Sequence, residues 1–187
     1  MPHTAGFAHP SRNALHFGIE PGMSVADFGA GSGHYVWPMA QALGPSGHLF
    51  AIDVQQDLLK RIHNEAHKRG LNQVKIIWAD LEKPKASKIA DRTLDLVLIS
   101  NLLFQLEDKA AVVREAKRIL KPSGRLVVID WVDSFNMMGP HKKDVVAKDV
   151  GLALLLDNGF KLVREFPAGA HHWGIIARSE TGGVKVS

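Results

Sequence analysis

The 187-residue sequence predicts an α/β fold with a mostly parallel seven-stranded sheet and helices on both of its faces. Short apolar runs alternate along the chain with stretches of helical periodicity, as in strands joined by covering helices. Several of the runs are apolar almost throughout, which is typical of strands buried on both faces. The expected strands are Met23–Phe28, His48–Ile52, Val74–Trp78, Leu94–Ile99, Arg125–Trp131, Lys161–Phe166 and Trp173–Ala177.

Apolar residues recur at helical spacing between these runs. The sequence Lys-Pro-Ser-Gly at 121–124 and the pair Asn158-Gly159 supply stop signals for two of the helices. The last two apolar runs are joined by little more than residues 167–170, whereas a parallel crossover needs about a dozen residues. These two strands are therefore expected to be antiparallel neighbours. The expected helices lie within 10–18, from about His34, and at Asp57–Arg69, Asp108–Leu120 and Val145–Asp157.

Composition is that of an ordinary globular protein, with 45% hydrophobic and 22% charged residues. The length favours one domain over 1–187, with an N-terminal arm at 1–20 and a flexible tail at 179–187. No apolar stretch approaches the ~18 residues of a membrane span and the first residues lack a signal-peptide core, so a cytoplasmic protein is expected. The absence of cysteine excludes disulfides, thiolate metal sites and thiol-based arsenic chemistry. A net charge of +4 is too small to indicate a nucleic-acid partner.

The segment VADFGAGSGHY at 25–35 follows the first strand and carries glycine at alternate positions, Gly29, Gly31 and Gly33. Glycine permits a tight turn and lets backbone N–H groups approach a ligand without a Cβ in between. An ordinary strand-to-helix turn is the alternative interpretation. A dinucleotide-binding loop has its third glycine, or an alanine, one position later, where this chain has His34, so a nicotinamide cofactor is disfavoured.

Polar side chains follow the next three strands. Asp53 comes about twenty residues after the glycine loop, where a carboxylate accepts hydrogen bonds from both hydroxyls of a ribose. Asp80 follows the third strand, in a position to accept from an adenine amino group, and Asn101 follows the fourth. Each residue alone is more often a cap or a turn residue. Together they are expected at the edge where open α/β sheets bind ligands.

In this order the motifs resemble those of the class I S-adenosylmethionine-dependent methyltransferases. The matching segments are VADFGAGSGHY at 25–35, AID at 51–53, WADLE at 78–82, LDLVLISNLLFQLED at 94–108 and LKPSGRLVVIDW at 120–131. The most similar branch acts on small molecules and includes the ubiquinone/menaquinone-biosynthesis methyltransferases. The resemblance implies a Rossmann-like sheet of order 3-2-1-4-5-7-6 with strand 7 antiparallel. It also implies S-adenosylmethionine as cofactor, methyl transfer to a small-molecule acceptor and release of S-adenosylhomocysteine.

The resemblance further implies nine cofactor contacts. The methionine part is contacted by Gly29, Gly31 and Gly33, with Asp27 at the loop and the amino group and Asn101 at the methionine end. Asp53 holds the ribose. The adenine is contacted on one face by Val54 and at its edge by Asp80 and the Leu81 amide. The chain departs from other branches after the fourth strand. Ser100-Asn101-Leu102-Leu103 replaces the Asn/Asp-Pro-Pro-aromatic motif, which disfavours the DNA and RNA enzymes that methylate amino groups. Leu103-Phe104-Gln105 replaces the aromatic residues or His pair of many small-molecule enzymes, so the acceptor stays open.

Methyl transfer requires a base only when the acceptor is protonated. Histidine is the natural candidate for that base. The candidates are His172, which opens the last strand, and His141, in the connection after the fifth strand. A helix at the N-terminus can fold over the cofactor in the resembling family. The candidates for the substrate pocket are therefore His16 and Phe17 in that helix, together with Phe104 and Trp131; packing is the alternative role for each.

Two other functions stay open for the sequence. Methylation of RNA or protein would require a basic surface beside the cofactor site, and S-adenosylmethionine binding without catalysis would leave the motifs intact. His63 and His67 have the i,i+4 spacing that can chelate a metal, but they lie on a covering helix away from the cofactor edge, so no metal is expected. The expected state is a monomer or a homodimer that has no membrane partner.

Overall fold

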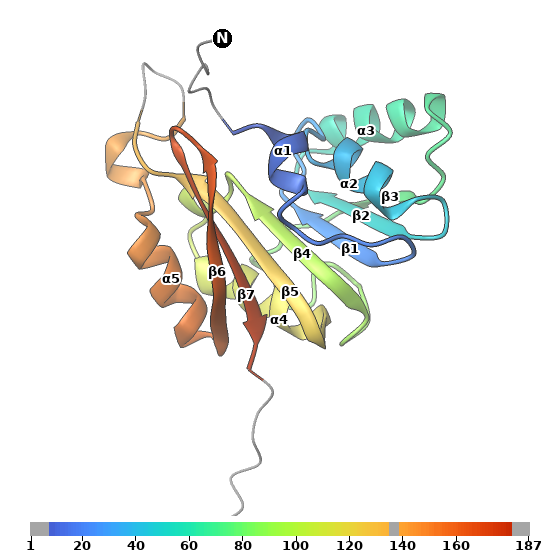
Figure 1. Cartoon of the computed structure of the whole chain (residues 1–187). Helices are drawn as coiled ribbons and strands as arrows, with labels where there is room; N and C mark the ends of the chain where they lie inside the picture. The colour runs from blue at the N-terminus through green and yellow to red at the C-terminus, as the bar shows by residue number, and fades with distance from the viewer. Residues whose placement is uncertain (1–7, 135–138, 181–187) are drawn as a thin grey trace, which may run out of the picture.

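The computed structural model describes residues 8–134 and 139–180 (Figure 1). Seven strands form one sheet in the order β3-β2-β1-β4-β5-β7-β6. β7 runs antiparallel to β5 and β6, and the other neighbouring strands are parallel. This confirms the predicted fold class and strand order. The strands are β1 (Ser24–Phe28), β2 (His48–Asp53), β3 (Val74–Trp78), β4 (Leu94–Ser100), β5 (Leu120–Trp131), β6 (Phe160–Gly169) and β7 (His172–Ser179).

Helices cover both faces of the sheet, and each face has its own apolar core (Figure 1). In β4, Leu96 and Leu98 join the core on one face, whereas Val97 and Ile99 join the core on the other. This alternation explains why a buried parallel strand is apolar throughout. One face carries α1 (Pro10–Ala14), α2 (Val36–Leu43) and α3 (Gln56–Lys68), and the other carries α4 (Lys109–Ile119) and α5 (Lys148–Asp157); η1 (Leu103–Gln105) and η2 (Lys142–Asp144) are 3₁₀ turns.

β5 begins earlier than the sequence predicts. Leu120 already pairs with Leu94, and the register then shifts so that Arg125 pairs with Leu96. Residues 121–124 therefore bulge out between two paired positions. The run with proline and glycine that reads as a helix stop thus belongs to the strand, because a bulge accommodates a residue that cannot donate to the ladder.

The last two strands form the predicted hairpin. β6 continues to Gly169 and β7 begins at His172, which leaves only residues 170–171 as the turn. Because β7 is antiparallel, its first residues lie at the edge where the parallel strands end. α5 begins at Lys148 rather than at Val145, and Val145 has extended backbone angles.

Two predicted segments reach beyond the described part of the chain. Residues 1–7 of the expected arm and residues 181–187 of the expected tail lie outside it. Among the residues that the structure describes, no helix combines the length and the apolar character needed to cross a membrane.

Candidate functional site

A cavity of about 610 Å³ opens at the edge of the sheet where β1, β2 and β4 end. Its volume lies within the range of about 300–1,000 Å³ that is typical of small-molecule sites. Open α/β sheets bind their ligands at this carboxyl edge. Ten of the residues predicted from the sequence line the cavity: Asp27, Gly29, Gly31, Asp53, Val54, Asp80, Leu81, Asn101, Trp131 and His172.

The three glycines after β1 have left-handed backbone angles but different surroundings. A Cβ on Gly31 would meet no atom closer than 3.9 Å, so the backbone of Gly31 faces open space in the cavity. A Cβ on Gly29 would collide with the side chain of Leu102, and one on Gly33 would press on Ile62 of α3. Gly31 is therefore the point where the main chain can approach a ligand. Gly33 is not part of the lining, and its lack of a side chain lets α3 pack closely.

Asp53 at the end of β2 joins the glycine loop to the second strand. Its side chain is buried. Oδ2 accepts a hydrogen bond from the N–H of Gly31 at 2.8 Å, and Oδ1 accepts one from the N–H of Gln55 at 2.8 Å. A carboxylate offers about four lone-pair positions, so both oxygens retain acceptor capacity for ribose hydroxyls. The arrangement fits the predicted ribose contact.

The cavity lining is acidic. Asp27, Asp53, Asp80 and Glu82 contribute carboxylates, and no Lys or Arg lines the cavity within the described ranges. Burial raises the pKa of Asp27 to about 7, with a smaller contribution from the negative charge of Asp53. A cation beside Asp27 stabilises its ionised form. S-adenosylmethionine carries a sulfonium and an ammonium group, so its charge suits this lining.

Asn101, just after β4, lines the cavity and has an unpaired side-chain acceptor. Its φ of 53° is left-handed, which costs a non-glycine residue roughly 1–3 kcal/mol. Two hydrogen bonds hold this backbone: its N–H donates to Ile129 O at 2.9 Å, and its carbonyl accepts from Gln105 Nε2 at 2.8 Å. Asn101 Oδ1 is buried and has no partner in the described part of the structure. A ligand N–H group would satisfy it.

The two ends of the cavity differ in exposure. At the open end, Val54 is 57% exposed, and its carbonyl accepts a hydrogen bond from Trp78 Nε1 at 2.9 Å. Asp80 lies at the same end, where its Oδ1 accepts from the N–H of Glu82 at 3.0 Å, and Leu81 is buried beside it. The predicted adenine contacts therefore lie together at the ends of β2 and β3.

The closed end is aromatic. Trp131 ends β5 and His172 begins β7, and these residues pair directly across the two strands with ring centroids 4.2 Å apart. His172 is 5% exposed, and neither ring nitrogen has a hydrogen-bond partner among the described residues. Burial lowers the pKa of His172 to about 4; His171 lowers it further, whereas Asp133 raises it. The imidazole is therefore neutral near pH 7.

A family model described as "Methyltransferase domain" matches residues 19–171 of this chain. The chain belongs to the class I S-adenosylmethionine-dependent methyltransferases. S-adenosylmethionine is its cofactor, in agreement with the glycine loop and the acidic lining. Among residues 8–134 and 139–180 of this methyltransferase, no group of three His, Asp or Glu side chains is arranged to hold a metal ion.

Known proteins resemble the methyltransferase over most of its length. It is 30% identical over 191 residues to the ubiquinone/menaquinone biosynthesis C-methyltransferase of Pasteurella multocida, an alignment that covers 86% of this chain and 69% of that enzyme. It is 32% identical over 134 residues to the arsenite methyltransferase of Aquipseudomonas alcaligenes, covering 65% of this chain but only 38% of that enzyme. A crystal structure of an S-adenosylmethionine-dependent methyltransferase from Aquifex aeolicus has a TM-score of 0.83 and 26% identity, with coverage of 95% and 93%.

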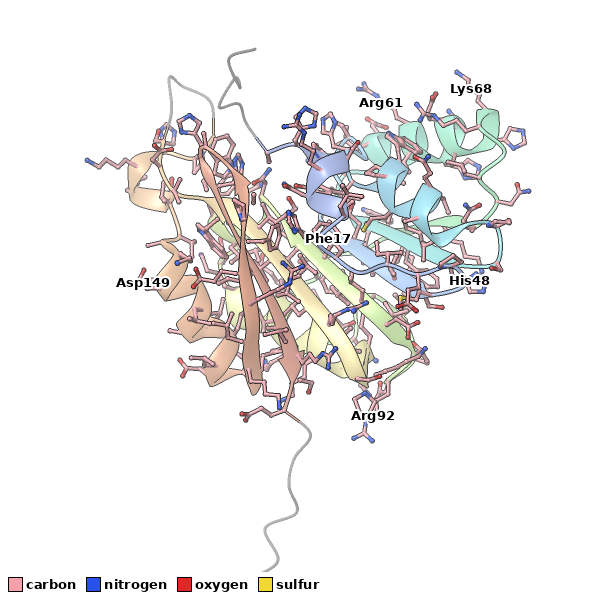
Figure 2. The ribbon with its side chains drawn as sticks, viewed as in Figure 1. Phe17, His48, Arg61, Lys68, Arg92 and Asp149 are labelled. Atoms are coloured by element: carbon pink, nitrogen blue, oxygen red, sulfur yellow. The ribbon has the colours of Figure 1, made fainter. Side chains whose placement is uncertain are left out.

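Several predicted site residues of the methyltransferase do not reach the cavity. Phe17 is fully buried and packs between Tyr35 and Phe166, with ring centroids 5.9 Å and 6.2 Å away (Figure 2). His16 stacks on Phe166 at 5.0 Å. Of the described residues at the N-terminal end, Ala8 and Pro10 line the cavity. Phe17 therefore belongs to the core under α1, because its large apolar ring gains more from burial than from a place over the ligand.

Two further predicted residues lie elsewhere. Phe104 is half-buried in η1 and packs against the core shared with α4 and α5. His141 is exposed just before η2. Of the two histidines proposed as a base, only His172 lines the cavity.

Tyr35 and Asn13 have no role predicted from the sequence. Tyr35 lines the cavity, and its hydroxyl accepts a hydrogen bond from Asn13 Nδ2 at 2.9 Å. The same amide group donates to the carbonyl of Ala168 at 2.9 Å, so α1 is tied both to the start of α2 and to β6. Nothing in the spacing of these residues signals the contact, which joins segments 22 and 155 positions apart in the chain.

Proposed function

We propose that this methyltransferase transfers a methyl group to a small-molecule acceptor and releases S-adenosylhomocysteine. The observation that carries the proposal is the extent of the cavity. It continues from Asp27 and Asn101 to the buried pair Trp131 and His172. The end of β4 and the start of β7 are two strand spacings apart, which is about 10 Å. A space of this width suits an acceptor the size of a small ring rather than a polymer.

The residues of the cavity divide between two tasks. Bound S-adenosylmethionine supplies a methyl carbon made electrophilic by the sulfonium. Asp53 accepts from the ribose hydroxyls, while Asp27 and Asn101 Oδ1 face the amino group of the methionine part. The buried walls at Trp131 and His172 hold the acceptor and keep water away from it, and this positioning is the main requirement of methyl transfer.

Three observations bear on the class of acceptor. The names of two relatives refer to ubiquinone or menaquinone biosynthesis and to arsenite, which supports a small acceptor. The absence of cysteine argues against arsenite. Methylation of RNA is not supported, because no Lys or Arg of the described residues lines the cavity, and Arg61 and Lys68 project outward from α3 (Figure 2).

Calorimetry and a release assay test the proposal. S-adenosylmethionine and S-adenosylhomocysteine should bind, NAD should not, and a panel of phenols, amines and carboxylic acids should contain acceptors that release S-adenosylhomocysteine. Total RNA and a mixture of proteins serve as competing acceptors. Release with RNA or protein alone would contradict the proposal, as would cofactor binding without release by any acceptor.

A further inference from the structure

We propose that His172 contacts the methyl acceptor and takes up its proton, and that the acceptor is therefore an uncharged ring compound methylated on a hydroxyl group. This inference rests on the proposed function, since it assigns the acceptor end of the same cavity. Under this inference His172 is a catalytic residue, the acceptor is a phenol-like molecule and the reaction is its O-methylation.

The place of His172 in the fold supports a contact with the acceptor rather than with the cofactor. The ribose residue Asp53 ends β2, and β1, β4 and β5 separate that strand from β7. His172 is thus four strand spacings, about 19 Å, from the ribose end of the cavity. It nevertheless lines the same cavity, directly across from Trp131.

The imidazole lacks the partners that a buried polar ring normally has. Both nitrogens are buried and unpaired in the described part of the chain, although buried polar groups are almost always hydrogen-bonded. A neutral imidazole has one N–H donor and one lone pair. A hydroxyl group both donates and accepts, so it can pair with either nitrogen.

Burial is the main reason why the His172 ring is neutral. The titratable groups whose charge acts on His172 are His171 and Asp133, and they pair with each other, with Nδ1 of His171 3.0 Å from Oδ1 of Asp133. The other titratable groups of the cavity are Asp27, His34 and Tyr35, with Asp53, Asp80 and Glu82 at its open end. Because burial lowers the pKa of His172 to about 4, the ring carries a free lone pair near pH 7.

The lining also restricts the acceptor. With no Lys or Arg among its described residues, it offers no countercharge to a carboxylate, a phosphate or a phenolate. A protonated amine has no lone pair to attack the methyl carbon, and a neutral imidazole of low basicity would not deprotonate it first. The apolar walls at Leu102, Leu106 and Trp131 suit the body of a ring.

The proposed step balances in atoms and charge. The hydroxyl oxygen forms a bond to the methyl carbon, and the carbon–sulfur bond breaks with its electron pair remaining on sulfur. The hydroxyl proton, which becomes strongly acidic as the new bond forms, passes to the unprotonated nitrogen of His172. The products are a methyl ether, a thioether and an imidazolium, so one positive charge is present before and after. A weak base suffices because the proton transfers late.

The test uses phenol as a probe on the protein loaded with S-adenosylhomocysteine. In protein labelled with ¹⁵N-histidine, phenol should shift the ring signals of His172 and leave those of His67, on α3, unchanged. His172→Phe keeps a ring but removes both nitrogens. We expect it to retain its affinity for S-adenosylhomocysteine and to bind phenol about tenfold more weakly, the effect of one lost hydrogen bond in a buried site.

Each other outcome overturns a definite part of the inference. If phenol leaves the His172 signals unchanged, or binds the variant as well as the parent, His172 does not contact the acceptor. If benzoate or benzylamine shifts those signals more than phenol does, the acceptor class is wrong. Should His172→Phe fail to fold, His172→Gln and the signals of the parent protein decide the matter. Failure of the parent to bind S-adenosylhomocysteine would instead reject the proposed function.

Discussion

The carboxylate of Asp53 accepts a hydrogen bond from the backbone N–H of Gly31 at 2.8 Å. This bond joins the end of β2 to the loop after β1, 22 positions earlier in the chain. Gly31 is the position at which an added Cβ would stand in open space within the cavity. One side chain thus fixes the loop that approaches the cofactor and also offers acceptors to the ribose. Removal of the Asp53 carboxylate should therefore affect both the position of the loop and the binding of the ribose.

Asp53→Ala should weaken binding of S-adenosylmethionine by roughly 1.5–3 kcal/mol, the range for hydrogen bonds to a charged group. The free energy of unfolding should fall by about 1 kcal/mol, because the N–H groups of Gly31 and Gln55 lose their partner. Calorimetry and urea denaturation measure the two effects. Asp57→Ala, which removes an exposed carboxylate on α3, is the control and should change neither. If Asp53→Ala binds S-adenosylmethionine with the affinity of the parent protein, Asp53 does not bind the ribose.

Gly31→Val should weaken cofactor binding far more than it reduces the stability of the folded protein. Gly31 has a φ of 53°, so a β-branched residue there is strained by roughly 1–3 kcal/mol. The new side chain would also enter the cavity that the cofactor needs. In urea denaturation, we expect the free energy of unfolding to fall by the backbone strain alone. Calorimetry should show an almost complete loss of S-adenosylmethionine binding.

Gly70→Val is the matched control for this substitution. Gly70 has a φ of 67°, no atom lies within 4 Å of its added Cβ, and it follows α3 outside the cavity. The backbone strain should be similar, while the affinity for S-adenosylmethionine should stay unchanged. Equal binding losses in the two variants would mean that strain, and not the approach of the backbone to the ligand, accounts for the result.

The strand order was predictable because the family motifs are tied to strand ends, and the hairpin because its connection is too short for a crossover. The start of β5 was not. Residues 121–124 look like a helix stop, and only the pairing of Leu120 with Leu94 shows that they form a bulge. Local sequence signals describe turns well but carry no information on which distant residue is the partner.

The same limit applies to the site. Asp53 and the glycine loop were predictable because their spacing is set by adjacent elements. His141 and His172 were indistinguishable in the sequence, since both lie in or beside connections. Only the antiparallel register of β7, which sets His172 opposite Trp131, separates them. Phe17 was a candidate for the substrate pocket with packing as the alternative role, and it lies in the core; a short helix does not reveal from its sequence which face it buries.

Asn13→Ala should loosen α1 and thereby weaken cofactor binding indirectly. The amide of Asn13 donates to Tyr35 and to Ala168 O, and both contacts are buried. Their loss should reduce the free energy of unfolding by roughly 1–3 kcal/mol. Because Pro10 at the start of α1 lines the cavity, the dissociation rate of S-adenosylhomocysteine should rise in stopped-flow measurements. Arg12→Ala, at an exposed position on the same helix, should leave stability and rate unchanged.

Binding of S-adenosylmethionine should strengthen as the pH rises toward 7. The pKa of Asp27 is raised to about 7, so below that value the carboxyl is protonated and must release a proton when the cation binds. The apparent affinity should therefore fall by up to about tenfold per pH unit below 7. Calorimetry in two buffers of different ionisation enthalpy measures the released proton. Asp27→Asn should bind more weakly and without this pH dependence; a parent that shows no proton release at low pH would contradict the assignment.

The stability of the free protein should carry a separate signature of His172. Its pKa is lowered from 6.5 to about 4 in the folded state, so the unfolded chain binds more protons between these values. The contribution of the neutral, buried ring to the free energy of unfolding is therefore fully present above pH 6.5. It is lost as the pH falls toward 4. Asp27 acts in the opposite sense, because a raised carboxyl pKa costs stability as the pH rises from 3.8 to about 7. The parent curve alone therefore mixes the two effects.

Comparison with His172→Gln isolates the histidine, since glutamine does not titrate and the contribution of Asp27 is common to both proteins. Relative to this variant, the parent should lose roughly 1–3 kcal/mol of unfolding free energy as the pH falls from 6.5 to 4. Urea denaturation at several pH values in that window measures the difference. His67→Gln, at an exposed position on α3, is measured alongside as the control for a histidine-to-glutamine change outside the cavity. A constant difference between parent and His172→Gln would mean that the ring is hydrated in the free protein, and a hydrated ring would not hold the unpaired nitrogens on which its contact with the acceptor depends.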